Sequence, residues 1–167
     1  MESRYSGKVV TRAIIIATVI AGTLDILSTF VYAIMAGGTP LGVLSGIGGA
    51  IVDREAFSNP YALPAIGLAL HFTIMLVMAT VYLLAASRIS LLNRLPVLSG
   101  IGYGLALWGV MYWIVLPQRW PTMFPVDPRL DPKGFAEDLF SHIVLVGIPI
   151  ALVAKSATRW RFTSDYY

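Results

Sequence analysis

The apolar run around His71 constrains this chain most. Residues 64–87 are 24 in a row without lysine, arginine, aspartate or glutamate. A helix crosses the hydrocarbon core of a bilayer with roughly 20 apolar residues. The run therefore predicts a transmembrane helix over 60–87, with His71 near its middle. An ionisable side chain at that depth is costly unless it faces protein or water, so this span also indicates where function lies.

Three further apolar runs predict spans over 13–36, 96–117 and 135–155. The chain is 57% hydrophobic and 13% charged, whereas soluble domains carry about 25% charged residues. We therefore predict an all-α polytopic fold, one transmembrane domain over 1–167 with the lipid bilayer as solvent. There is no cysteine. Basic residues lie between the spans and not in a patch, which does not indicate nucleic-acid binding.

The segment 40–52 is apolar but too short to span a bilayer. Pro40 suits the first turn of a helix and Thr39 suits its N-cap. We predict a short interfacial or re-entrant helix here. Gly42, Gly46 and Gly49 recur at helical spacing, which favours close contact with another helix.

Glycines also predict where the spans pack. Gly100 and Gly104 form a Gly-x-x-x-Gly pair, the usual seam for close helix packing in membranes. Gly102 and Gly109 belong to a second stripe of small residues, so either face of this span could pack. Gly22 lies on the same helical face as Asp25, and we expect that face to meet other helices.

The distribution of charge predicts the orientation. Eight of the lysines and arginines lie at the N-terminus, in the loop 88–95 and in the tail that starts at Lys155, against four in the other two connections. Because cytoplasmic segments carry the excess of lysine and arginine, both termini are predicted to be cytoplasmic. The proline-rich stretch 118–134 predicts an extended surface loop, with Tyr112, Trp113 and Trp120 in an aromatic belt at the interface.

Three ionisable residues lie within or near the spans, namely Asp25, His71 and His142, and Glu137 and Asp138 open the last span. At 1.5 Å per residue, Asp25 and His71 lie about 16 Å from the outer ends of their spans and His142 about 10 Å. We expect Asp25 and His71 to face each other across the first two spans. The pattern favours a polar cleft that binds or passes a proton, an ion or a small solute.

Other interpretations stay open. The buried polar groups could fix helix packing in an accessory or scaffold subunit of a larger membrane complex. The protein could also form a homo-oligomer. His71 and His142 could hold a b-type haem, although their different depths make a shared axis awkward. Met75 and Met78 share the face of His71, a pattern compatible with Cu(I) but more typical of core packing. No hydrolase, P-loop, dinucleotide or zincin motif is present, so no enzyme activity and no cofactor is predicted.

Short motifs carry a family resemblance. They are Gly22–Asp25, Pro40–Ile47, the residues around His71, Tyr103–Gly104 and Ile114–Pro117. In these the chain resembles small four-helix bacterial inner-membrane proteins of uncharacterised function. From His71 onward it is loosely similar to the YagU-like family, including Glu137 and the Ser141–His142 pair. The resemblance implies four helices and a bacterial inner membrane, and it implies no reaction.

Overall fold

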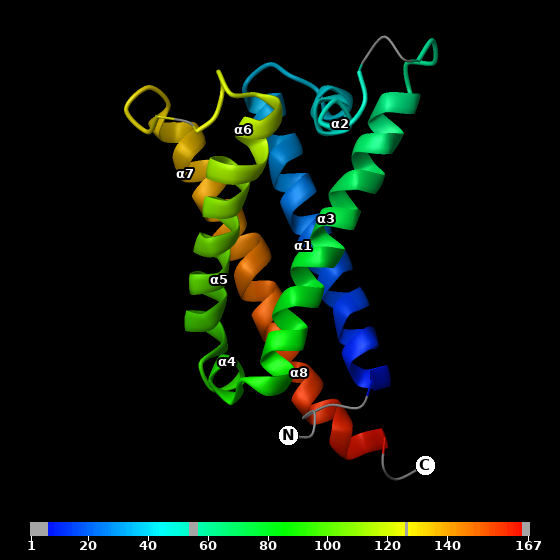
Figure 1. Ribbon diagram of the computed structural model, residues 1–167, viewed down its shortest axis with the longest axis vertical. Coiled ribbons are helices and arrows are strands. Elements are labelled where there is room, and N and C mark those ends of the chain that lie inside the picture. The colour runs from blue at the N-terminus through cyan, green and yellow to red at the C-terminus, as the bar shows by residue number, and fades with distance from the viewer. Residues whose placement is uncertain (1–6, 54–56, 126, 165–167) are drawn as a thin grey trace.

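Four helical stretches of membrane-spanning length dominate the structure. The computed structural model describes residues 7–53, 57–125 and 127–164, without the side chains of 158–164. The described residues form helices and no strands. The stretches long and apolar enough to cross a membrane are Gly7–Met35, Ala62–Arg88, Pro96–Arg119 and Pro132–Ala157. The predicted all-α polytopic fold is confirmed, and the two termini lie at the same end of the bundle (Figure 1).

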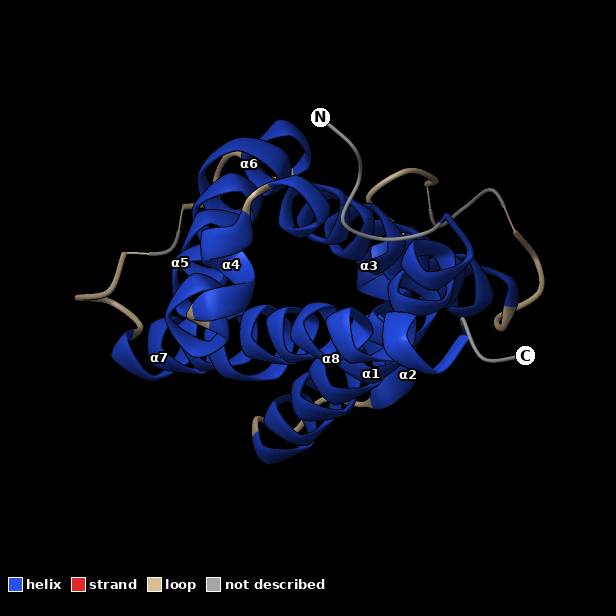
Figure 2. Cartoon of the chain, turned by 90° about the horizontal axis from the view of Figure 1, so that it is seen from below, coloured by secondary structure: helices blue, strands red, loops and turns tan. Residues whose placement is uncertain are grey.

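Two spans are continuous helices and two are interrupted. The first span is α1 (Gly7–Met35) and the second is α3 (Ala62–Arg88). The third consists of α5 (Pro96–Val110), the π-helical segment η2 (Met111–Val115) and α6 (Leu116–Arg119). The fourth consists of α7 (Pro132–Phe140), the π-helical segment η3 (Ser141–Gly147) and α8 (Ile148–Ser164). The last span contacts the other three and is the central helix of the bundle (Figure 2).

The fourth span begins at Pro132, earlier than the predicted 135. The side chain of Asp131 caps it by accepting a hydrogen bond from the Gly134 N–H at 2.8 Å. Proline suits the first helical position because its missing N–H would have no partner there. The added turn places every residue of this span deeper below its outer end than the sequence estimate did.

The short helix α2 (Pro40–Gly48) lies across the ends of α1 and α3 and is seen end-on in Figure 1. As predicted, Thr39 is its N-cap and accepts a hydrogen bond from the Gly42 N–H at 3.0 Å. The expected contact glycines were wrong. A side chain on Gly46 would meet nothing within 4 Å, whereas Gly48 packs against the backbone at Leu63.

A second short helix, α4 (Ser90–Arg94), replaces the loop expected over 88–95. Asn93 is buried in it, and its side-chain amide donates to the Ala86 carbonyl at 2.7 Å. The Asn93 carbonyl in turn accepts from the Lys155 ammonium at 2.9 Å. These two bonds connect the turn to α3 and α8.

Small side chains close the half of the bundle that carries the termini. Alanines buried to 1% exposure or less come from α1, α3 and α8: Ala13, Ala17, Ala21, Ala79, Ala86, Ala151, Ala154 and Ala157. Small residues let helix backbones approach closely in a membrane. This alanine seam leaves no room between the helices at that end.

Glycines make the contact between the third and fourth spans. A Cβ on Gly100 would lie 2.7 Å from the Cα of Ile148, and one on Gly104 would lie 2.6 Å from the Cα of Ile143. Gly102 and Gly109 would meet nothing within 4 Å. The predicted Gly100–Gly104 seam is therefore confirmed, and the alternative stripe of small residues is not a packing face.

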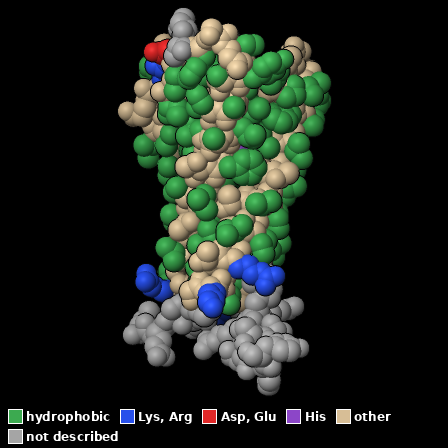
Figure 3. All heavy atoms as spheres, turned by 90° about the vertical axis from the view of Figure 1, so that its right-hand side faces the viewer, with side chains coloured by type: hydrophobic (Ala, Val, Ile, Leu, Met, Phe, Trp, Pro, Cys, Tyr) green, Lys and Arg blue, Asp and Glu red, His purple; other side chains and the backbone are tan. Residues whose placement is uncertain are grey.

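Charge is distributed unequally between the two ends. The described cations at the end with the termini are Lys8, Arg12, Arg88, Arg94 and Lys155, and no described aspartate or glutamate accompanies them. Figure 3 shows lysine and arginine side chains gathered at this end, below a face covered by apolar side chains. At the other end Arg119, Arg129 and Lys133 are mixed with acidic residues. Arg4, Arg54 and the side chains of Arg159 and Arg161, also used in the topology prediction, lie outside the described residues.

Candidate functional site

The spans enclose a cavity of about 700 Å³ at the end away from the termini. Its walls come from all four spans, from α2 and from the loop after α6. Ala36, Ala50 and Trp120 line it at the outer end, and Met78 lines it at the inner end, next to the alanine seam. The cavity is therefore a cup that is closed toward the termini.

All five residues predicted as candidate ligand-binding groups line this one cavity: Asp25, His71, Glu137, Asp138 and His142. Four further polar residues line it as well, namely Thr29, Tyr32, Tyr112 and Ser141. No lysine or arginine is among the lining residues, which all belong to the described part of the chain. The cup therefore carries carboxylates and imidazoles without a fixed cation.

Asp25 of α1 and His71 of α3 face each other, as the sequence predicts. The Asp25 Oδ2 lies 4.0 Å from the His71 Nδ1, and their side chains are 13% and 7% exposed. This distance is too long for a direct hydrogen bond. One water or one ligand atom between them would satisfy both groups.

The hydrogen bond made by the other nitrogen of His71 determines which ring nitrogen carries the hydrogen. Nε2 lies 2.9 Å from the Gly22 carbonyl oxygen. Because a carbonyl only accepts, Nε2 carries the hydrogen and a neutral ring presents a bare Nδ1 toward Asp25. Gly22 itself packs as predicted, since a Cβ there would lie 2.8 Å from the ring of Phe72.

His142 is held in the same manner on the facing span. Its Nδ1 donates to the Asp138 carbonyl at 2.9 Å, so the neutral ring leaves Nε2 bare. No described residue hydrogen-bonds to this Nε2. Asp25 lies within electrostatic range of both imidazoles. A carboxylate therefore stands beside two rings whose free nitrogens are acceptors.

The three groups lie at one depth, contrary to the sequence estimate for His142. Asp25 is ten residues from the end of α1 at Met35, and His142 is ten residues from the start of α7 at Pro132. Both lie about 15 Å deep at 1.5 Å per residue, and His71 lies about 14 Å deep below Ala62. Gly104 makes this arrangement achievable, because only a glycine lets α5 touch the backbone of His142.

Both π-helical segments lie at the cavity, and the sequence analysis missed them. The Leu116 N–H donates to the Met111 carbonyl, and the Ile148 N–H donates to the Ile143 carbonyl, five residues back in each case. Each segment ends two residues before a proline, Pro117 or Pro149, whose ring crowds the preceding turn and removes an N–H. The structure thus shows a widened turn before each of these two prolines. Such turns are frequent at functional sites.

A hydroxyl network joins α1 to η3 beside Asp25. The Ser141 Oγ lies 3.1 Å from the Ser28 Oγ and 3.4 Å from the Tyr32 hydroxyl oxygen. The Ser28 hydroxyl also donates to the Asp25 backbone carbonyl at 2.8 Å. Ser28 and Tyr32 share the helical face of Asp25, which was the signal in the sequence, but their partner on η3 was not predictable.

Aromatic residues form one wall of the cavity. Tyr112 contacts Phe124 and His142 edge to face, with ring centroids 5.5 and 5.6 Å apart. Trp120 lies next to Phe124 and also lines the cavity. The predicted surface loop therefore folds over the mouth, and two of the three predicted belt residues face inward. Trp113 alone points outward, with 60% exposure.

The geometry bears on the metal and haem interpretations. Among the described residues, no three histidines, aspartates or glutamates are grouped closely enough to hold a metal ion. Met75 and Met78 are buried in the hydrophobic core at the base of the cup. The free Nδ1 of His71 faces the Asp25 carboxylate, so an iron could reach it only by displacing that carboxylate. The arrangement fits a haem poorly.

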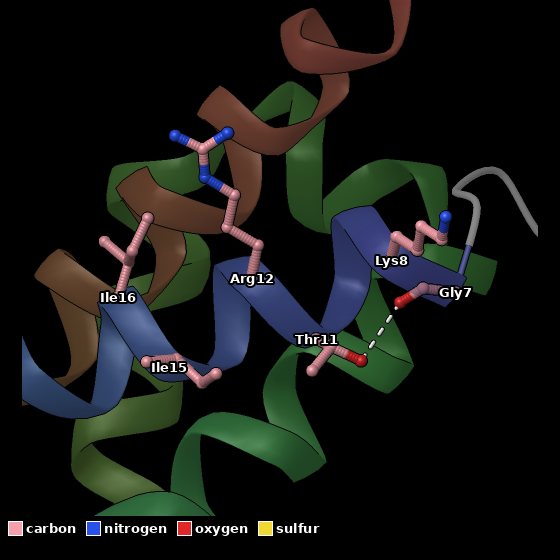
Figure 4. A pocket seen from close by; sticks show the side chains of 6 residues that line it. All are labelled: Gly7, Lys8, Thr11, Arg12, Ile15 and Ile16. Atoms are coloured by element: carbon pink, nitrogen blue, oxygen red, sulfur yellow. Dashed lines mark hydrogen bonds between the residues drawn. The ribbon is translucent and has the colours of Figure 1, made fainter. Parts of the chain in front are cut away.

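A second hollow lies on the surface at the start of α1. Figure 4 shows its lining residues, which all come from this one helix: Gly7, Lys8, Thr11, Arg12, Ile15 and Ile16. The Thr11 hydroxyl bonds to the Gly7 carbonyl of its own helix at 3.1 Å. This hollow belongs to the cationic end and brings no reactive groups together from different elements.

The chain matches no protein-family model, no curated protein and no solved structure.

Proposed function

We propose that this protein binds a small polar or cationic solute in the cup formed by its four spans. One observation carries the proposal. Asp25, His71 and His142 come from three different spans and line one cavity with room for a ligand, and Asp25 lies 4.0 Å from His71. Ionisable groups are costly inside a membrane, so a cavity lined by several of them indicates a functional site.

The lining selects against anions. Asp25, Glu137 and Asp138 supply carboxyl groups, and no lysine or arginine balances them within the lining. Lys133 approaches Glu137 at 3.5 Å, but it lies on the solvent side of α7 with 62% side-chain exposure. A cation or a neutral hydrogen-bond donor is therefore the favoured ligand.

The orientation is part of the proposal. Five described lysines and arginines lie at the end with the termini, where the described residues include no aspartate or glutamate, and this supports a cytoplasmic location for both termini. The resemblance to small bacterial inner-membrane proteins supports a bacterial inner membrane. In this orientation the cup opens toward the periplasm.

The closed lower half favours binding over free passage. The alanine seam fills the space between α1, α3 and α8 below Met75 and Met78. A solute that enters from the outer side therefore reaches Asp25 and His71 and stops at Met78. Transport would require a second conformation in which the seam opens, as in alternating access.

An accessory-subunit role is the second candidate. The observation that favours it is that His71 and Ser141 bond to the backbone or side chain of α1, so the same polar groups also fix helix packing. A subunit of this kind would purify with partner proteins and would respond to no solute.

Gly46 provides a direct test. It lines the cavity, and a Cβ there would meet nothing within 4 Å, so the Cβ of Gly46→Phe has space and the ring is added at the cavity wall. We expect solutes from a panel of amines, alcohols and carboxylates to raise the thermal stability of the purified protein, and Gly46→Phe to remove that response. Gly102→Phe is the matched control, because Gly102 is exposed on another span. No response from any solute would overturn the proposal.

A further inference from the structure

We propose that the cup recognises a primary ammonium group, held by Asp25, His71 and His142. This inference rests on the proposed function and names the class of ligand. It starts from the hydrogen-bonding partners of each polar group in the cavity.

Most polar groups in the cup already have partners. The Thr29 hydroxyl donates to the Asp25 backbone carbonyl at 3.0 Å, and Ser141 bonds to Ser28. The carboxyl group of Asp138 interacts with the Tyr112 hydroxyl. In contrast, no described residue donates a hydrogen bond to the Asp25 carboxylate. A carboxyl group that is only 13% exposed and accepts no hydrogen bond from a described residue is a position where a ligand can donate one.

The two imidazoles add acceptors to that carboxylate. The His71 Nε2 is bonded to Gly22 and the His142 Nδ1 to the Asp138 carbonyl, both at 2.9 Å. The opposite nitrogen of each neutral ring therefore carries a lone pair. His71 presents its lone pair 4.0 Å from the Asp25 carboxyl group, and His142 lines the same cavity from the fourth span. Acceptors from three spans are thus available to one ligand.

A primary ammonium matches this arrangement in number and charge. It has three N–H donors, one for the carboxylate and one for each imidazole nitrogen. A quaternary ammonium has no donor and would leave the imidazoles unsatisfied. Alkali cations prefer oxygen ligands and gain little from two nitrogens, and a carboxylate ligand would meet like charge.

The wall of the cavity suits the carbon chain of such a ligand. Ile74 and Met75 line the cavity on the inner side of His71, and Met111 and the rings of Tyr112 and Phe124 line it toward the mouth. Apolar and aromatic surface buries methylene groups favourably. The ligand we infer is therefore a primary alkylammonium that enters with its charged end toward Asp25.

Four matched probes test the inference by titration calorimetry on the full chain in detergent. They are butylammonium, butyltrimethylammonium, butanol and butyrate. We expect butylammonium to bind at least about tenfold more tightly than the other three, a factor of ten being about 1.4 kcal/mol. Equal binding of the quaternary and primary ions would overturn the inference, as would preference for butanol or butyrate.

Variants locate the site. Asp25→Asn should weaken butylammonium binding at least about tenfold, because it removes the charged acceptor. Thr73→Val is the matched control, since Thr73 is exposed, does not line the cavity and bonds only within its own helix, and it should bind within about twofold of the wild type. An unchanged affinity in Asp25→Asn would refute the assignment. If that variant does not fold, the four-probe comparison on the wild type still decides.

The failures of the two proposals are distinguishable. If solutes other than amines stabilise the protein and Gly46→Phe removes the effect, the cavity binds a ligand and only the ammonium assignment fails. If no solute of any class has an effect, the proposed function fails with it.

Discussion

His71 shows how one buried polar residue can serve both packing and a site. Its Nε2 donates to the Gly22 carbonyl and connects α3 to α1, while its Nδ1 faces Asp25. The ring is 6% exposed and stands edge-on to Phe72 at 5.2 Å. Loss of the ring would leave a buried carbonyl of Gly22 without its donor from α3.

We therefore predict that His71→Ala lowers the free energy of unfolding by about 1–3 kcal/mol, because it removes a buried hydrogen bond between α1 and α3 and leaves a cavity where the ring was. Unfolding in mixed detergent micelles, followed by circular dichroism, measures the change. Thr73→Ala is the control, because Thr73 is exposed and bonds only within its own helix. Equal stability of the two variants would show that the contact with Gly22 contributes nothing.

Among the elements, the third and fourth spans depend most on backbone contact. Gly100 and Gly104 of α5 lie against η3 and the start of α8, and Gly147 lies against Gly100 and Gly104 in return. The same contact positions the turn that carries His142. Helix packing and the geometry of the cup are therefore linked at Gly104.

Gly104→Ala should destabilise the protein by about 1–3 kcal/mol, because its Cβ would overlap the backbone of His142 and Ile143. Gly104→Leu should have a larger effect. Gly102→Ala, in open space two residues away, should stay within about 0.5 kcal/mol of the wild type. The same unfolding assay measures the stability of all these variants. If Gly104→Ala is as stable as the wild type, the two spans can move apart without loss of stability.

For the molecule as a whole, the direction of the cup decides which compartment supplies the ligand. The cavity mouth lies at the end away from the termini. The cationic residues at the opposite end support the orientation we propose.

Because the chain has no cysteine, single cysteines report this orientation directly. An impermeant thiol reagent added outside intact cells should modify Ser58→Cys and Asp131→Cys but not Ser90→Cys. Permeabilised cells, in which all three should react, are the control. The reverse labelling pattern would place the mouth of the cup in the cytoplasm.

Features that follow from local sequence were predictable. Apolar length predicted the four spans, and Thr39 with Pro40 predicted the start of α2, since a cap needs only neighbouring residues. The face of α1 with Asp25 was also predictable, because helical periodicity alone brings Gly22, Ser28 and Tyr32 to one side.

Features that depend on contacts between residues far apart in the sequence could not be predicted. The sequence could not show which glycines of α2 and α5 touch a neighbour, because that depends on helix rotation and crossing. Nor could it show that the π-helical turns would form before Pro117 and Pro149, or that Trp120 and Phe124 would fold inward. Asp25, His71 and His142 were identifiable one by one from their cost in a membrane. Their convergence on one cup was decided by packing, since close contact at the alanine seam and at Gly104 sets how far apart the outer halves of the spans lie.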